Sequence, residues 1–153
     1  MILRHASSAA CLALIAALPA PAAEPAPDTR VPIVLTSAER EYVLAGMRGH
    51  IQEIQTVTSA LASGDREGAR AAALQGGTRH FATLTDHPPG LAEKWPAAWK
   101  QMLRARLASF DALAEGIGDG DSATQTMQRL STVLQTCAAC HAAYRLASGS
   151  EKP

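Results

Sequence analysis

The residues with the clearest chemical meaning lie near the C-terminus, in the run Cys137-Ala138-Ala139-Cys140-His141. Two cysteines separated by two residues and followed by histidine have the spacing at which c-type haem is attached. Each thiol can form a thioether with one haem vinyl group, and the histidine can bind the iron. In a helix, Cys137 lies three residues before Cys140 and four before His141, so all three share one face. The run predicts one haem c, bound covalently through both cysteines, with His141 as an iron ligand.

The first 23 residues have the pattern of a cleavable secretory signal. Arg4 and His5 precede an apolar run from Cys11 to Leu18, and small residues suited to cleavage follow it. The apolar run is too short to span a membrane. We therefore expect residues 1–23 to be removed, and the mature chain to be periplasmic, without a membrane span and with the two motif cysteines as its only thiols.

Composition narrows the classes of function. The chain has 153 residues, which favours one domain. Its 14 Lys and Arg balance 14 Asp and Glu, so no basic excess predicts binding to nucleic acid. Only 4% of residues are aromatic, so a bound porphyrin is one candidate for filling the core. The sequence contains no nucleophile–base–acid set and no phosphate-binding loop, and we expect no enzymatic activity.

Apolar residues recur at alternating steps of three and four along most of the chain, which is the pattern of helices in a bundle. We expect residues 24–35 to form an extended, proline-rich leader and residues 36–148 to form one helical domain without strands. The short turns between helices favour an all-α, up-down-up-down four-helix bundle with covalently attached haem. The expected helices run from Thr36 or Ser37 to Ser63, from Arg66 to about Thr85, from Leu91 or Pro96 to about Gly118, and from Asp121 or Ser122 to about Ser148.

The apolar stripes place the motif on the inner side of the last helix. The stripe of that helix comprises Met127, Leu130, Leu134, Cys137, His141 and Tyr144. The stripe of the first helix comprises Leu44, Met47, Ile51, Ile54, Thr58 and Leu61. His141 is thus expected on a buried seam, where it would face another helix of the bundle.

The second axial position of the iron decides the chemistry, and the first helix offers three candidates for it. Met47 carries a thioether, which is a known haem ligand. Leu44, one turn earlier, would leave the iron five-coordinate under an apolar side chain. His50 lies beside the stripe. A six-coordinate iron would carry electrons, whereas an open face could bind NO, CO or O2.

Three arginines are candidates for pairing with the haem propionates. Arg40 and Arg106 fall on apolar stripes, and Arg145 lies four residues after His141. A buried carboxylate requires a hydrogen-bonded partner, which arginine can supply. Alternatively, each side chain could lay its stem on the apolar surface and extend its charged head into water.

A signal segment, four helices and the sequence C-A-A-C-H-A-A-Y-R near the C-terminus together resemble the class II cytochromes c, the cytochrome c-prime family. The resemblance covers roughly residues 36–147. It implies a bundle that holds haem between its helices and often forms a dimer. One branch of the family is five-coordinate and binds NO, and the other uses a methionine of the first helix to carry electrons. The segment from Leu35 to Arg48 looks more like the second branch.

The resemblance therefore implies a periplasmic electron-transfer protein with His141 and Met47 as iron ligands and an unidentified redox partner. The alternative within the family is a gas-binding cytochrome with Leu44 over an open iron. A third reading needs no haem: the two cysteines could form a dithiol or metal-binding module. Redox dithiols commonly sit at a helix N-terminus, whereas this pair is expected deep within a helix.

Overall fold

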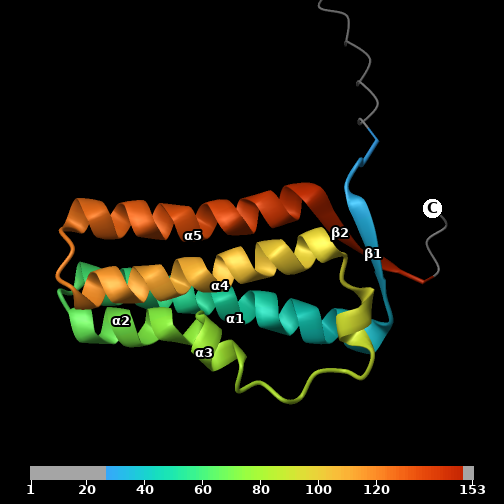
Figure 1. The fold of residues 1–153 in the computed structure, drawn as a ribbon, viewed down its shortest axis with the longest axis horizontal. Helices are drawn as coiled ribbons and strands as arrows, with labels where there is room; N and C mark the ends of the chain where they lie inside the picture. Colours follow the sequence, from blue (N-terminus) through green and yellow to red (C-terminus); the bar gives the residue numbers. More distant parts are fainter. Residues whose placement is uncertain (1–26, 150–153) are drawn as a thin grey trace, which may run out of the picture.

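The computed structural model describes residues 27–149, and the predicted signal peptide, residues 1–23, lies outside them. The described part is mostly helical with one small pair of strands (Figure 1). Its elements, in chain order, are β1 (Val31–Leu35), α1 (Ser37–Ala62), α2 (Arg66–Gln75), α3 (Thr78–Phe81), the 3-10 helix η1 (Leu91–Lys94), α4 (Ala97–Gly118), α5 (Ala123–Ala143) and β2 (Tyr144–Ser148).

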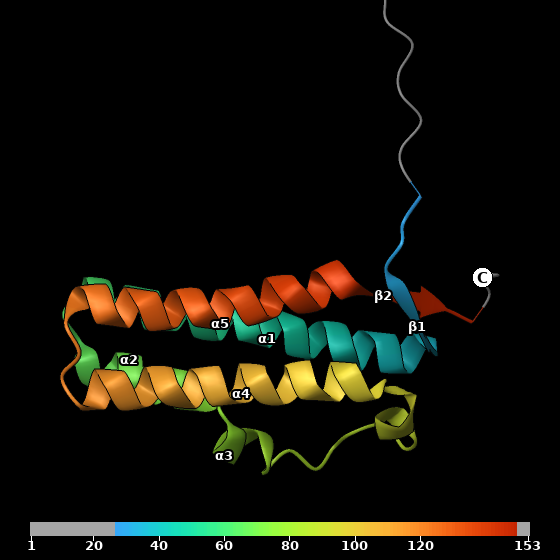
Figure 2. The same cartoon turned by 45° about the horizontal axis from the view of Figure 1, so that its top comes forward.

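Three helix pairs make the most extensive contacts: α4 with α5, α1 with α2, and α2 with α4. Figure 2 shows α1, α4 and α5 running alongside one another, with the strand pair at the end where α1 begins and α5 ends. The helices α1 and α5 are therefore antiparallel. The contact between α1 and α5 is not among the extensive ones.

Two apolar clusters lie at opposite ends of these helices. The first surrounds the fully buried Phe110 and joins the C-terminal halves of α1 and α4 to the N-terminal half of α5. The second lies under the strands, where Ile33 and Leu35 pack with Leu91 and the stacked rings of Trp95 and Trp99. The cysteine motif lies in the last two turns of α5, next to the cluster under the strands.

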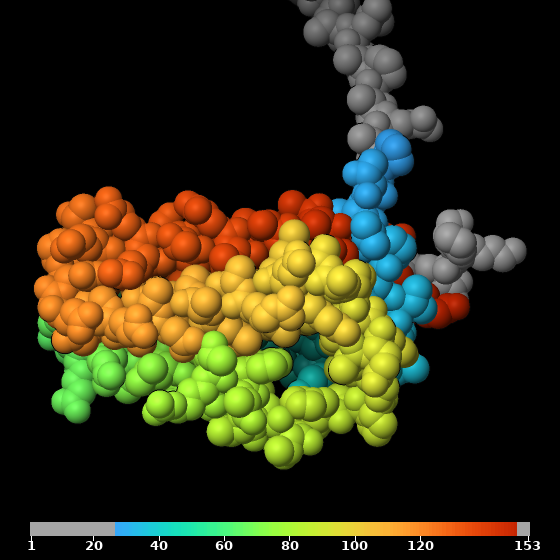
Figure 3. All heavy atoms as spheres, viewed as in Figure 1, coloured from blue at the N-terminus to red at the C-terminus, as the bar shows by residue number. Residues whose placement is uncertain are grey.

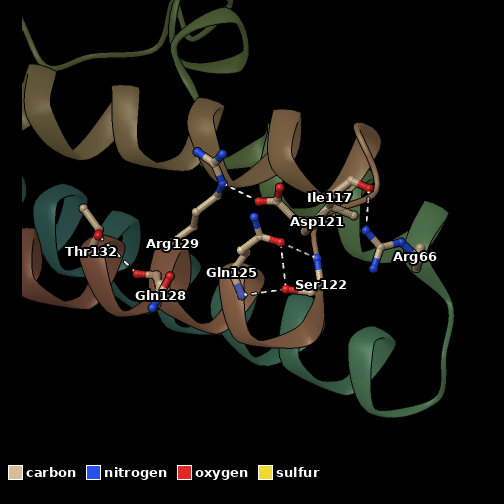
Figure 4. Close-up of polar contacts among 8 residues, drawn as sticks. All are labelled: Arg66, Ile117, Asp121, Ser122, Gln125, Gln128, Arg129 and Thr132. Carbon is tan, nitrogen blue, oxygen red and sulfur yellow. Dashed lines mark hydrogen bonds and ion pairs between the residues drawn. The ribbon is translucent and has the colours of Figure 1, made fainter.

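The predicted starts of the first and last helices, α1 and α5, are confirmed. Thr36 caps α1, and Glu39 completes a capping box whose carboxylate also accepts a hydrogen bond of 2.6 Å from Lys94. Ser122 and Gln125 form the same box at the start of α5 (Figure 4). These boxes give partners to backbone N–H groups that a helix leaves unpaired at its first turn.

The expectation of a strand-free domain is wrong. Part of the predicted leader forms β1, which pairs in parallel with β2 in a register that places Val31 opposite Tyr144. For the same reason the last helix ends at Ala143, and the residues predicted to continue it to Ser148 are extended. The strands are more than 100 residues apart, so no local pattern in the sequence reveals the pairing.

The second helix was expected to run to about Thr85, either straight or kinked at Gly76 and Gly77, but the structure divides it into two helices at these glycines. The chain leaves α2 at Gly76 and begins α3 after Gly77. The backbone N–H of Thr78 donates to both carboxylate oxygens of Asp111, at 3.1 and 3.2 Å. A Cβ atom at Gly76 would lie 2.5 Å from the ring of Phe110, so the glycine allows α2 to approach α4 closely.

We predict that Gly76→Ala destabilises the protein by about 1–3 kcal/mol, because the added methyl group overlaps a fully buried ring that cannot move without disturbing the core. Urea unfolding followed by circular dichroism measures the change. Gly46→Ala is the matched control, since a Cβ atom there meets nothing within 4 Å. That change lies within α1 and should stabilise the helix by about 0.5–1 kcal/mol. Equal effects of the two substitutions would contradict the prediction.

Candidate functional site

The cysteine motif occupies the last two turns of α5. Cys137 and Cys140 are free, half-buried thiols. The carbonyl of Cys140 accepts a hydrogen bond from the backbone N–H of Tyr144, where the helix ends. His141 is exposed, so the expectation that it lies on a buried seam is not met.

This difference arises because α5 is rotated relative to its apolar stripe. The buried residues of α5 are Thr126, Leu130 and Val133. Met127 and Leu134, which the stripe predicted to be buried, are 57% and 46% exposed. Since α5 packs extensively on α4, its buried face turns toward that helix. His141 lies seven residues after Leu134, two helical turns further along the same side. The histidine and both apolar side chains therefore share one uncovered side of α5.

Arg106 of α4 is the charged residue that the interior holds beside the two cysteines. It is 9% exposed, and its guanidinium lies 5.6 Å from the centre of the Phe110 ring. Its Nη1 atom is buried and has no hydrogen-bond partner among residues 27–149. Burial lowers the pKa of this guanidinium, while the nearby charges of Glu53, Cys137 and Cys140 act to raise it. A buried cationic donor without a partner is unfavourable, so this position suits an additional anionic group.

On α1, Met47 and Leu44 are both half-buried but lie on different sides of the helix. Met47 is seven residues before Ile54, which packs against the main apolar cluster. Leu44 is seven residues before Ile51, which is 67% exposed. Because residues seven apart lie on one side of a helix, Met47 is on the inward side of α1 and Leu44 is turned further outward.

The depth of these residues along the helices can be counted from the end where α1 stops and α5 starts. His141 lies 18 residues beyond Ala123, or about 27 Å. Met47 lies 15 residues before Ala62, or about 22 Å, and Leu44 lies at about 27 Å. Side chains lean toward the N-terminus of their own helix. Because α1 and α5 are antiparallel, the side chains of Met47 and His141 lean toward each other along the helix axis and reach similar depths. The side chain of Leu44 starts at the depth of His141 and leans away from it.

The third candidate of α1, His50, is half-buried and already has a partner. Its Nδ1 atom lies 3.1 Å from Oε2 of Glu53. Glu53 in turn is close enough to Arg106 to affect its pKa. Sequence reasoning missed Glu53. In the structure it lies four residues before the buried Val57, on the same side of α1, so it is turned toward the interior.

The three candidate arginines have different surroundings. Arg40 is exposed, so its predicted place on the buried stripe is wrong. Arg145 is half-buried and forms an ion pair with Asp28, with 3.8 Å between Nε and Oδ2. Arg106 is the member of this set that the fold places in the interior next to Cys137 and Cys140.

The middle of the assembly contains open space at the level of the motif. Gly46 lies seven residues after Glu39 and eleven before Val57, and both of these are buried, so Gly46 faces inward. It is nevertheless exposed, and a Cβ atom there would meet nothing within 4 Å. Figure 3 shows a hollow between α4, α3 and η1, with α1 visible at its floor. In this view the hollow lies on the side of α4 away from α5, the helix that carries the motif.

The chain was compared with known protein families, with curated proteins and with solved structures, and none of them matches it. Within residues 27–149, no group of three or more His, Cys, Asp or Glu side chains is arranged to hold a metal ion. No helix in the same range has a stretch both long and apolar enough to cross a membrane.

The electrostatics of Cys140 bear on the dithiol reading. Burial raises the pKa of this thiol above its ordinary value of 9.0, the neighbouring Cys137 adds to the increase, and Arg106 opposes it. A reactive redox dithiol requires a lowered pKa, because the thiolate is the nucleophile. The surroundings of Cys140 therefore do not favour thiol redox chemistry.

In the chain with free thiols, we predict that the alkylation rate of Cys140 rises with pH and reaches its midpoint above pH 9. The reason is that the buried thiol ionises less readily than an exposed one. Arg106→Met should move this midpoint higher still, because the cation that favours the thiolate is lost. Differential labelling read by mass spectrometry measures both values, and a midpoint well below pH 9 would contradict the prediction.

Proposed function

We propose that this chain is an exported, periplasmic c-type cytochrome that carries electrons on a single haem. Cys137 and Cys140 would attach the haem, and His141 and Met47 would bind its iron. The observation that carries the proposal is the C-x-x-C-H run, whose two free, half-buried thiols lie beside Arg106, a buried arginine with an unpartnered Nη1.

The proposal includes the finer description of the fold. The helices α1, α2, α4 and α5 would form an up-down-up-down four-helix bundle of the class II cytochrome c type, with α3 and η1 in its long middle connection. The chain order, the short turn from α4 to α5 and the position of the motif near the C-terminus support this assignment. A homodimer and an unidentified redox partner protein remain part of the same proposal.

When bound, haem supplies the one-electron chemistry, and the protein supplies attachment, orientation and electrostatics. The two thioethers would fix the position of the ring, and His141 would bind the iron from the α5 side. Leu134 is an exposed apolar side chain on the same side of α5 as His141, and a bound ring could cover it. Arg106 would pair with a propionate, which gives its unpartnered Nη1 an acceptor.

The inward side of α1 favours Met47 over Leu44 as the residue opposite His141. Met47 shares its side of the helix with Ile54, and its side chain leans toward the level that the His141 side chain approaches. A thioether in this position would give a six-coordinate iron, which transfers electrons with little rearrangement. The five-coordinate, gas-binding alternative with Leu44 would require that residue to turn inward.

We predict that the exported protein carries one haem that resists extraction by acidified acetone, and that Met47→Ala converts a low-spin ferric spectrum into a high-spin one. The reason is that the substitution removes the thioether ligand without changing the cysteine attachment. Mass spectrometry and absorption spectroscopy measure the two results. Met127→Ala is the matched control, because this methionine is exposed on α5 and should leave the spectrum unchanged. A high-spin spectrum in the unsubstituted protein would favour the gas-binding alternative.

Arg106→Met should have different consequences with and without haem. In a haem-free Cys137→Ala, Cys140→Ala background, we expect stability to be unchanged or raised by about 1–4 kcal/mol, because a buried cation is replaced by an apolar side chain. In the haem protein we expect a lower reduction potential, since a positive charge near the iron favours the added electron.

Urea unfolding and redox titration measure these two effects. Arg104→Met is the control, because Arg104 is exposed on the same helix and should change neither quantity appreciably. An Arg106→Met protein with an unaltered potential would contradict the placement of Arg106 beside the haem.

A further inference from the structure

The strand pair lies directly against the end of the cysteine motif, and its contacts suggest a role beyond closing the fold. We propose that Arg30 and the β1–β2 pair form a clasp, which holds the last turn of α5 and thereby positions His141 for iron binding. Arg30 is a positioning residue in this account. The proposal rests on the proposed haem function, because it concerns the orientation of the proposed iron ligand.

The first observation is a hydrogen bond at the end of α5. Nη1 of Arg30 donates to the backbone carbonyl of His141 at 3.4 Å, across 111 residues of sequence. The last carbonyls of a helix have no partners within the helix. Here the carbonyl of Cys140 is satisfied by Tyr144 and that of His141 by Arg30. A cation at this end also interacts favourably with the helix dipole.

The second observation is that Arg30 is itself held in place. Its Nε and Nη2 atoms donate to the two carboxylate oxygens of Asp28 at 2.9 and 2.8 Å. The same carboxylate lies 3.8 Å from Nε of Arg145, which belongs to β2. Hydrogen bonds from Arg30 lower the pKa of Asp28 to about 2, so the carboxylate stays charged near neutral pH. Asp28 thus links an arginine before β1 to an arginine within β2.

The third observation is that the strands are anchored by apolar packing. Ile33 and Leu35 of β1 are almost fully buried, and Tyr144 and Leu146 of β2 pack against the same cluster. Two strands alone are marginally stable in water, and exposed ion pairs contribute little. The cluster beneath the strands is therefore what holds β1 in place and keeps Arg30 at the end of α5.

These contacts have a consequence for the motif. A helix end without partners frays, and His141 is two residues before Ala143, the last residue of α5. Fraying of that turn would change the direction of the imidazole relative to Cys137 and Cys140. With β1 docked, the backbone of the turn is fixed by contacts from outside the helix. The clasp thus supplies the orientation that α5 alone cannot maintain at its end.

The test compares Arg30→Gln with Arg30→Lys and with Arg48→Gln in the full chain. Arg30→Lys keeps the charge and a donor, and Arg48 forms an exposed ion pair with Glu41 elsewhere on α1. We expect Arg30→Gln to speed amide hydrogen exchange at least tenfold at residues 142–146 without changing exchange in α4. In the haem protein, we expect its ferric electron paramagnetic resonance spectrum to show a second low-spin species. Arg30→Lys should restore both properties, and Arg48→Gln should alter neither.

Two results would overturn the inference. One is faster exchange throughout the chain, which would make Arg30 a general stabilising residue. The other is faster amide hydrogen exchange in Arg30→Gln at residues 142–146 together with an unchanged ferric spectrum. The clasp would then stabilise the helix end without any influence on His141. A failure of the proposed haem function is recognised separately, because the mass of the exported protein would then lack the haem.

Discussion

The burial of the Arg106 guanidinium beside the two cysteines is the constraint on which the rest of the site depends. It lies between two apolar clusters, beside both cysteines, and its Nη1 atom has no hydrogen-bond partner among the described residues. Such a group is costly unless an anion accompanies it. A porphyrin attached to the neighbouring thiols would bring carboxylates to this level, and the open space beside Gly46 lies there too. The buried charge of Arg106 and the two free thiols are the features that the proposed haem would use.

Helix packing explains why the site is open. The helix α5 turns its buried face toward α4, so its side with Leu134 and His141 is left exposed. The apolar clusters at the two ends fix the helices without filling the middle.

Several features of this arrangement were predictable from the sequence. Capping residues and alternating apolar spacing located α1, α4 and α5 closely, because these signals act over one or two helical turns. The helix that bears Cys137, Cys140 and His141 was predicted for the same reason, and so was the inward position of Arg106. The two glycines marked the place of a kink, but the full separation of α2 from α3 was not predicted, because it depends on contacts with Phe110 and Asp111 of another helix.

By itself, the sequence determined the chemistry of the motif, since residue type and local spacing suffice for two thiols and a histidine on one helical face. The tertiary structure alone decided which candidates lie around it: it placed Arg106 beside the cysteines, left Arg40 exposed and separated Met47 from Leu44. It also brought β1 and Arg30 to the end of α5. These contacts join residues that are far apart in the chain, and only the packing of whole helices and strands determines which of them meet.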